Sequence, residues 1–247
     1  MTYVTSPLDL EAIRDSGRVL RKIFDKIEGI LKPGVSTLEI NDQVERWIIE
    51  EGAVPAFKGY RGYPSAICAS VDEVVVHGIP SKDNKLKNGN IISIDIGVKK
   101  NKFYTDAAKT FVIGNISAET KELIHVTKDS LEKGIQKAVA GNRIGDISAA
   151  IEKVIAKTRF KEVRSFVGHG VGARLHEDPE VPNWGEAGKG VLLKEGLVLA
   201  IEPMVNAGTR EVVVLDDGWT AITKDRKVSA HFEHTIIVGK INAEVLT

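Results

Sequence analysis

Five side chains of metal-binding type stand in surroundings where an unpaired charge is unfavourable. Asp95 lies within the apolar run 91–96, and Glu202 ends the apolar run 198–201. Burying a carboxylate is costly unless a partner compensates its charge. The other three candidates are Asp106 and Glu233, in segments expected to be strands, and His169 in the glycine-rich segment Gly168-His169-Gly170-Val171-Gly172. Together these residues indicate a site for two metal ions.

The donor types narrow the choice of metal. Carboxylate oxygens and an imidazole suit Mn, Fe, Co or Zn, and the absence of thiolates argues against a structural zinc site. Two such ions about 3.5 to 4 Å apart can share a water, lower its pKa and polarise a carbonyl, which is what amide hydrolysis requires. The competing interpretation is that Asp106 is a solvated acid at a strand end, and that a lysine or arginine neutralises Glu202 and Glu233.

A predicted hairpin brings two of these acids together. With Lys100-Asn101 as a two-residue turn between strands 91–98 and 103–112, Asp95 stands directly opposite Asp106. Two facing carboxylates repel each other unless a cation lies between them. The hairpin therefore supports the metal hypothesis.

Three of the six histidines stand in segments that suggest a function. His77 lies in Val76-His77-Gly78-Ile79-Pro80, and His176 follows His169 by seven residues. A single histidine is more often an ordinary core or surface residue, so these three gain weight only from the residues around them. The remaining three, on an expected helix or strand, are interpreted as ordinary residues: His125, His231 and His234.

Helices and strands that could position these groups follow a repeated order. Helices are expected at about 7–32, 37–52, 118–140 and 146–157. Ser6 and Ser117 cap the first and the third, and Ser36 with Glu39 forms a capping box for the second. Strands are expected at 71–76, 91–98, 103–112, 163–167 and 198–201, and the segment 210–239 is rich in β-type runs.

The second half of the chain repeats the first at an offset of 107 residues. The segment 86–95 aligns with 193–202, ending on Asp95 and Glu202, and Gly34 aligns with Gly141 at the same offset. Chance is the alternative for so short a match, but a shared offset counts against it. The pattern predicts an α/β protein with a single domain of residues 1–247. Its two helix-helix-strand halves, about 5–112 and 113–240, would each place an acid in one central cleft.

Composition excludes several classes of protein. Lys+Arg and Asp+Glu both number 34, so no overall charge favours nucleic acid or an anionic membrane. No apolar run approaches the roughly 20 residues that span a bilayer, and the first residues lack a secretory pattern. Cys68 is the only cysteine, which excludes an intrachain disulfide and suits a reducing compartment. A soluble, cytoplasmic protein is expected.

Five motifs occur in order along the chain: Val76-His77-Gly78-Ile79-Pro80, the pair Asp95 and Asp106, Gly168-His169-Gly170-Val171-Gly172 with His176, Ile201-Glu202-Pro203-Met204-Val205, and Phe232-Glu233-His234-Thr235. This ordered set resembles the type I methionine aminopeptidases of the M24 metallopeptidase family, over about residues 6–240. The resemblance implies the pita-bread (creatinase/aminopeptidase) fold, with two pseudo-symmetric halves around a central curved antiparallel sheet. It also implies a hydrolase that removes N-terminal methionine with two divalent metal ions.

The resemblance assigns roles to individual residues. Asp95 would bind one metal ion, Asp106 and Glu233 would bridge both, and His169 and Glu202 would hold the other. Glu202 would also relay the proton of the attacking water, while His77 and His176 would contact the substrate and stabilise the tetrahedral intermediate. The methionine pocket would use Tyr60, Tyr63, Cys68, His77 and Trp219.

Two positions depart from the family pattern and leave the shape of this pocket open. Leu175 stands where an aromatic residue is expected, and Phe57 stands where relatives often carry a small one. Neither residue is a metal ligand, so the departures bear on substrate fit alone.

The resemblance further implies a monomeric, short bacterial-style enzyme acting on nascent polypeptides with a small second residue. It leaves open whether the protein contacts the ribosome, and it implies binding neither to a membrane nor to a specific nucleic acid. The nearest alternative is a proline-directed peptidase of the same fold, such as prolidase or aminopeptidase P, which usually carries an extra N-terminal domain. A non-catalytic pita-bread module that binds proteins or RNA is a further alternative, but such modules typically lose metal ligands.

Overall fold

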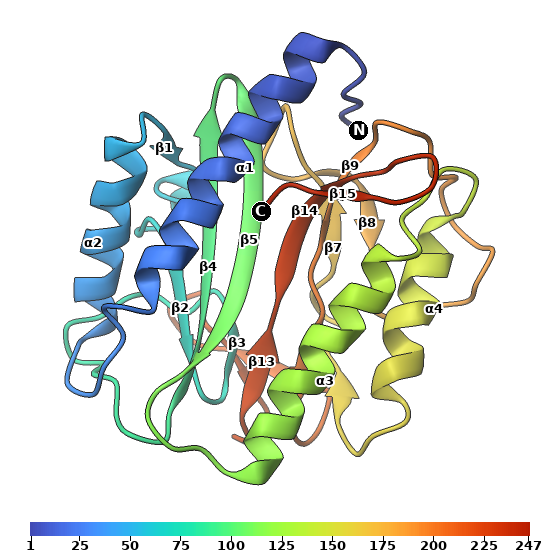
Figure 1. Cartoon of the computed structure of the whole chain (residues 1–247). Coiled ribbons are helices and arrows are strands. Elements are labelled where there is room, and N and C mark those ends of the chain that lie inside the picture. Colours follow the sequence, from blue (N-terminus) through green and yellow to red (C-terminus); the bar gives the residue numbers. More distant parts are fainter.

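The computed structural model describes all residues, 1–247 (Figure 1). Its helices are α1 (Pro7–Ile27), α2 (Thr37–Glu50), α3 (Ala118–Ile135) and α4 (Ile144–Ile155), with a 3₁₀ turn at Tyr60–Gly62. The strands are β1 (Val54–Pro55), β2 (Cys68–Val71), β3 (Val74–Val76), β4 (Ile91–Lys100), β5 (Phe103–Val112), β6 (Lys161–Glu162), β7 (Gly168–Gly170), β8 (Glu177–Val181), β9 (Val198–Ile201), β10 (Met204–Asn206), β11 (Val212–Val214), β12 (Ala221–Thr223), β13 (Ser229–His231), β14 (Glu233–Ile237) and β15 (Glu244–Val245). None of the helices combines the length and the apolar composition needed to cross a bilayer.

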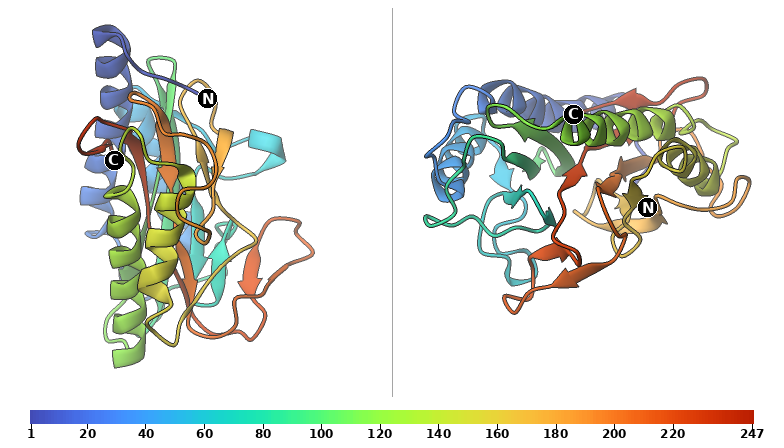
Figure 2. Two further views of the ribbon diagram at one scale, coloured as in Figure 1. Left: turned by 90° about the vertical axis from the view of Figure 1, so that its right-hand side faces the viewer. Right: turned by 90° about the horizontal axis from the view of Figure 1, so that it is seen from below.

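One large antiparallel sheet forms the centre of the molecule. Its strands run in the order β1-β4-β5-β14-β9-β7-β8, with β2 also paired to β4 and β15 to β14. Two small sheets, β13-β10-β6 and β11-β12-β3, complete the structure. Figure 2 shows the four helices along one face of the large sheet and the hairpin of β11 and β12 on the other side. The face without helices is therefore the one available for a site.

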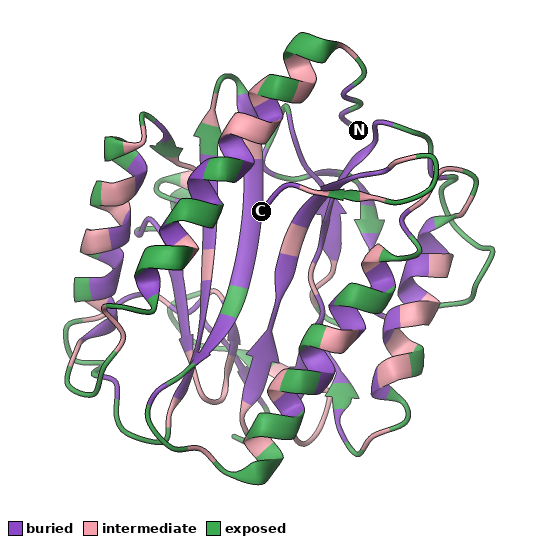
Figure 3. Ribbon diagram, viewed as in Figure 1, coloured by how far each residue is buried: buried purple, intermediate pink, exposed green.

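Alternation along the strands directs apolar residues to the helices and polar residues to the opposite face. On β4, Ile94 and Ile96 are fully buried in the core formed with α1 and α2. Asp95 between them therefore points to the other face, because successive side chains in a strand alternate. Leu199 and Ile201 on β9 belong to the corresponding core of α3 and α4. The central strands are buried over most of their length, whereas the helices expose their outer faces (Figure 3).

The 107-residue repeat is present in the backbone hydrogen bonds. The amide of Gly34 donates to the carbonyl oxygen of Leu86 at 2.8 Å, and the amide of Gly141 donates to that of Leu193 at 3.0 Å. Both glycines have positive φ, +94° and +97°, a conformation that side chains disfavour. The starts of α2 and α4, and of β4 and β9, are separated by the same interval. The predicted fold class, two pseudo-symmetric halves around an antiparallel sheet, is confirmed.

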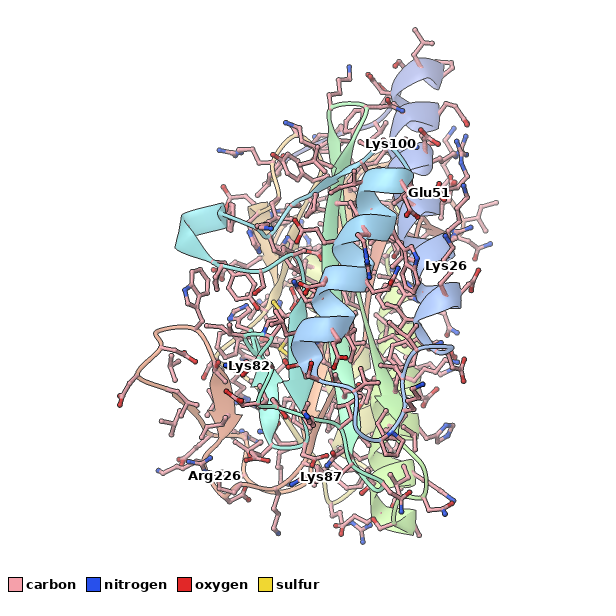
Figure 4. All side chains as sticks on the ribbon, turned by 90° about the vertical axis from the view of Figure 1, so that its left-hand side faces the viewer. Lys26, Glu51, Lys82, Lys87, Lys100 and Arg226 are labelled. Atoms are coloured by element: carbon pink, nitrogen blue, oxygen red, sulfur yellow. The ribbon has the colours of Figure 1, made fainter.

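A charged contact ties the tip of the β4–β5 hairpin to the neighbouring helices (Figure 4). The Nζ of Lys100 donates a 2.8 Å hydrogen bond to the carbonyl oxygen of Glu51, directly after α2, and lies 3.4 Å from Oδ2 of Asp15 on α1. Cations are favourable beside the unpaired carbonyls of a helix C-terminus. The contact helps to hold the long hairpin against the helix layer.

The predicted register of this hairpin was wrong by two residues. Lys100 pairs with Phe103, so the turn residues are Asn101 and Lys102, and Asp95 faces Ala108 rather than Asp106. Both turn residues have positive φ, 48° and 69°, as the central positions of a type I′ turn require. Asn tolerates this conformation at the first of them.

Several element boundaries also differ from expectation. The first helix ends at Ile27 because Gly29 follows its last turn, and the third ends at Ile135 rather than near residue 140. The expected strand 71–76 is two strands separated by a turn at Asp72, which has φ 49°. Residues 163–167 are not a strand, because the pairing with β9 is made by Gly168–Gly170.

Candidate metal centre

The five predicted metal ligands come from five adjacent strands of the large sheet. In the order of the sheet they are Asp95 on β4, Asp106 on β5, Glu233 on β14, Glu202 directly after β9, and His169 on β7. Residues more than a hundred positions apart in the chain therefore form one row across the centre of the sheet.

The strand register directs all five side chains to the same face. Ala108 pairs with both Asp95 and Glu233, and Asp106 is two residues before it. Ala200 pairs with His169, and Glu202 is two residues after it. Paired residues, and residues two apart in a strand, project from one face. The short side chains of the two alanines leave space between the ligands.

The distances between donor atoms fit a compact cluster. Ligand atoms of Asp106, His169 and Glu233 all lie within 4.8 Å of one another. The Nε2 of His169 is 4.0 Å from Oδ2 of Asp106 and 3.5 Å from Oε1 of Glu202. The Nδ1 of His169 lies 3.0 Å from the carbonyl oxygen of Gly170. When Nδ1 donates that bond, the lone pair of Nε2 faces the carboxylates and is free to bind a metal.

The carboxylates lack the partners that would make them ordinary buried acids. None of the four pairs with a lysine or an arginine; their only ion-pair contacts are to histidines. One buried oxygen each of Asp95, Asp106 and Glu233 has no hydrogen-bond partner. The interpretation that lysine or arginine neutralises Glu202 and Glu233 is therefore wrong.

The electrostatics of the cluster favour a bound cation. Burial and repulsion from neighbouring acids raise the pKa values of Asp95, Glu202 and Glu233 well above their usual range, and burial raises the pKa of Asp106 to about 7. Burial lowers the pKa of His169 to about 4, which keeps its imidazole neutral. A neutral imidazole and several carboxylates without counter-ions are suitable ligands for divalent metal ions. The free energy of metal binding offsets the cost of desolvating the acids.

Loading this centre with metal is expected to stabilise the protein. A ligand bound only by the folded state adds about 2.7 kcal/mol at a free concentration of 100 times Kd. Mn²⁺ or Co²⁺ should therefore raise Tm by roughly 5–11 °C over EDTA-treated protein, measured by scanning calorimetry. Asp106→Asn should lose most of that shift. Equal Tm values with and without each of Mn²⁺, Co²⁺, Fe²⁺ and Zn²⁺ would contradict the assignment.

A cavity of about 570 Å³ opens onto the metal centre. All of the sequence-predicted substrate residues line it: Tyr60, Tyr63, Cys68, His77, His176 and Trp219. Its apolar end is a cluster in which the rings of Tyr63 and Trp219 meet edge to face at 5.1 Å. The hydroxyl of Tyr63 donates at 3.1 Å to the carbonyl oxygens of Ile67 and Gly78, which fixes the ring in place. The apolar end of the cavity is therefore preformed.

The two histidines predicted to contact the substrate occupy different positions in the cavity. The ring of His176 lies 4.3 Å from that of His169, and its Nδ1 is 2.9 Å from the hydroxyl of Tyr60. His77 has a left-handed backbone, φ 59°, and its ring lies 6.2 Å from that of Trp219. Non-glycine residues held in this region cost about 1–3 kcal/mol and cluster at functional sites.

The two departures from the family pattern lie in one cluster. Phe57 and Leu175 both pack with Tyr63 and Cys68, and Phe57 lines the cavity. Phe57, which is larger than expected, thus lies in the same apolar wall as Leu175, which is smaller than expected. Gly97 makes room for this arrangement, since a Cβ there would lie 2.5 Å from the ring of Phe57.

Sequence reasoning missed one histidine beside the centre. His231 is buried, and its Nε2 has no hydrogen-bond partner and lies 3.6 Å from Oε2 of Glu202. Its position two residues before Glu233 could have revealed it, because residues two apart in a β-run share a face. His125, exposed on α3, and His234, whose Nδ1 lies 3.1 Å from Thr247, stay outside the cavity.

Replacing His231 is expected to weaken metal binding through Glu202. Partners of metal ligands typically contribute 10–100-fold in affinity, so His231→Leu should raise the Kd for Mn²⁺ by about that factor. His231→Gln, which retains an N–H donor, should recover most of the affinity. Isothermal titration calorimetry on both variants measures this. Equal affinities of the Leu variant and the unchanged protein would show that His231 only fills space.

The chain is similar over its whole length to known peptidases. The model of metallopeptidase family M24 matches residues 11–240. The chain is 48% identical to methionine aminopeptidase 1 of Bacillus subtilis (strain 168) over 247 residues, covering 100% of this chain and 99% of that protein. It is 42% identical to the crystal structure of methionine aminopeptidase from Thermotoga maritima, with a TM-score of 0.97 and coverage of 100% and 99%. The prolidase from Pyrococcus horikoshii has a TM-score of 0.80 at 22% identity, covering 99% of this chain and 63% of that chain, and shares the fold alone.

Proposed function

The chain belongs to metallopeptidase family M24, and from this premise we propose that it removes the N-terminal methionine of polypeptides by hydrolysing the first peptide bond. The observation that carries the proposal is the row of five donors on one sheet face, beside a cavity with an apolar end. Buried acids without lysine or arginine partners are suited to bind metal ions. The apolar end of the cavity beside them suits an unbranched thioether side chain.

We assign the metal-holding roles as follows. Asp95 would bind one ion, His169 and Glu202 the other, and Asp106 and Glu233 would be shared between them. The central places of Asp106 and Glu233 in the row, on the neighbouring strands β5 and β14, support that sharing. Divalent ions held there would supply Lewis acidity toward the scissile carbonyl and toward water.

The protein's own side chains would handle the proton and the developing charge. Glu202 would accept the proton of the attacking water on a carboxylate oxygen and pass it to the leaving amine. The hydroxyl of Tyr60 would donate to Nδ1 of His176, which leaves Nε2 of that ring protonated. Nε2 would then donate to the carbonyl oxygen as negative charge builds on it.

The pocket would select methionine by shape and apolarity. Tyr63, Cys68 and Trp219 form its buried end, and His77 packs against Trp219 where the side chain would enter. Burial also lowers the pKa of His77, so its ring stays neutral beside the substrate. Nascent polypeptides with a small second residue are the proposed natural substrates, acted on in the cytoplasm by a monomer. Contact with the ribosome remains a prediction.

A comparison of two peptides tests the proposal. The metal-loaded protein, supplied with Co²⁺ or Mn²⁺, should release methionine from Met-Ala-Ser and leave Ala-Pro peptides intact. Chromatography of the released amino acid measures both. Cleavage of Ala-Pro in preference to Met-Ala-Ser would favour a proline-directed peptidase, and no release with any divalent metal would favour a non-catalytic module.

A further inference from the structure

Two exposed arginines at the mouth of the cavity have no partner within the protein. Arg61 and Arg174 both line the cavity. Neither guanidinium pairs with a carboxylate or donates a side-chain hydrogen bond, whereas each of the other nine arginines does one or the other. Their only aromatic contact is that of Arg61 with the ring of Tyr60, at 5.4 Å. They are therefore free to meet a charge brought by a ligand.

Each arginine stands close in the chain to the proposed oxyanion-stabilising histidine or to its hydrogen-bond partner. Arg61 follows Tyr60, whose hydroxyl contacts Nδ1 of His176, and Arg174 is two residues before His176 in the chain. Burial, with smaller contributions from His169 and from the charge of Arg61, lowers the pKa of His176 to about 3, as expected for a guanidinium close to that ring. Arg61 thus belongs to the wall of the site rather than to a remote surface.

The backbone around Arg61 holds it at the rim. Arg61 has a left-handed conformation, φ 50° and ψ 25°, between Gly59 at φ 85° and Gly62 at φ 88°. This tight turn exposes Arg61 while the neighbouring Tyr63 remains buried. A strained non-glycine residue is retained where the surrounding structure imposes it, and such positions cluster at ligand sites.

Three acids that are not predicted metal ligands also line the cavity: Glu177, Asp178 and Glu180. The carboxylate of Glu177 already pairs with the N-terminal ammonium group at 3.0 Å and accepts a hydrogen bond from the backbone amide of Arg174 at 2.8 Å. Asp178 and Glu180 lie on β8, and both also line the adjacent cavity beside the start of α4, which the arginines do not. Arg61 and Arg174 are the only arginine or lysine side chains that line the catalytic cavity. A peptide whose methionine fills the buried end must leave through this mouth.

We propose that Arg61 and Arg174 form a cationic subsite that favours substrates with an acidic side chain at the third or fourth residue. The proposal rests on the methionine-removing function proposed above and adds a preference among its substrates. An extended chain advances about 3.3 Å per residue, so residues beyond the second lie outside the buried pocket, where the exposed guanidiniums are. Arginine binds carboxylates with two parallel N–H donors, which favours acids over amides of the same shape.

Matched peptides test the subsite. The C-terminally amidated series Met-Ala-Ser-Glu-Ala, Met-Ala-Ser-Gln-Ala and Met-Ala-Ser-Lys-Ala, together with Met-Ala-Glu-Ser-Ala, is assayed with the metal-loaded protein. Exposed ion pairs change equilibria by a small factor, so kcat/KM for the better Glu peptide should exceed that for the Gln peptide by about two- to fivefold. The Lys peptide should be slowest, and 0.5 M NaCl should reduce the differences.

Substitutions of the two arginines test whether they cause the preference for acidic peptides. Arg61→Gln with Arg174→Gln should abolish the ratio between the Glu and Gln peptides, and Arg61→Glu with Arg174→Glu should reverse it toward Lys. Arg46→Gln, at an exposed position on α2 away from the cavity, is the matched control and should retain it. Equal rates for Glu and Gln peptides, or a ratio that survives the double Gln change, would overturn the subsite.

A binding measurement separates this inference from the proposed function. Fluorescein-labelled versions of the same peptides, carrying the dye at the C-terminus, are titrated by anisotropy with the metal-loaded protein. If no peptide is hydrolysed, the proposed function fails, while the order of the Kd values still decides the subsite. Tighter binding of the Glu peptide supports it, and equal Kd values refute it.

Discussion

Glu202→Ala is expected to reduce kcat/KM for a Met-Ala-Ser peptide by about a thousandfold or more. The change removes a metal ligand and the proposed proton acceptor together, and loss of a general base alone costs about 10²–10⁴-fold. Asp95→Ala removes a ligand without removing a proton acceptor, and it should also abolish measurable turnover because one ion would lose its principal donor. Initial rates at saturating Mn²⁺ or Co²⁺ measure both.

The folded state is the control for these changes. Burial and the charge of Asp106 raise the pKa of Glu202, so its ionised form destabilises the metal-free protein at neutral pH, above the carboxyl's usual pKa. In EDTA, Glu202→Gln should therefore have a Tm no lower than that of the unchanged protein. Near-normal turnover in folded Glu202→Ala or Asp95→Ala would refute the metal centre as the catalytic site.

His176→Ala is expected to lower kcat by about 10²–10³-fold with a much smaller change in KM. That is the usual cost of removing one donor to the developing oxyanion, and it falls on kcat because the donor acts mainly in the transition state. The measurement is steady-state kinetics with the Met-Ala-Ser peptide over a range of concentrations.

Tyr60→Phe separates positioning from chemistry at His176. The change retains the ring but removes the hydroxyl 2.9 Å from Nδ1, so a loss of about two- to tenfold is expected, as for one neutral hydrogen bond. In the double variant, Tyr60→Phe should add nothing further, since the residue it orients is gone. Additive losses would show that Tyr60 acts independently of His176. A rise in KM alone for His176→Ala would make that residue a binding group.

Local features were predictable wherever neighbouring residues decide the structure. The Ser6 and Ser36 caps and the alternation of Ile94, Asp95 and Ile96 depend on contacts within a few residues, and all are present. The 107-residue repeat could also be recognised, because duplicated halves keep equivalent residues such as Gly34 and Gly141. These features predicted the α/β class and the two-halved architecture, and the resemblance to type I methionine aminopeptidases implied the pita-bread fold and the roles of the ligands.

The sequence pattern could not determine the register of the β4–β5 hairpin. The shift that places Asp95 opposite Ala108 depends on which two residues adopt positive φ in the turn, and Lys100-Asn101 and Asn101-Lys102 look equally acceptable. The expected meeting of Asp95 and Asp106 survives because a two-residue shift preserves the face. It makes their contact diagonal, and the third acid, Glu233, takes the place opposite Ala108.

The sequence by itself determined the kinds of donor in this protein, the duplicated architecture that carries them, and the family they resemble. Only the tertiary structure decided which groups lack partners: the carboxylates without lysine or arginine, His231 beside Glu202, and the free guanidiniums of Arg61 and Arg174. The physical reason is that side-chain type and local periodicity are properties of short segments. Whether a charge is satisfied depends on side chains that folding brings from distant strands.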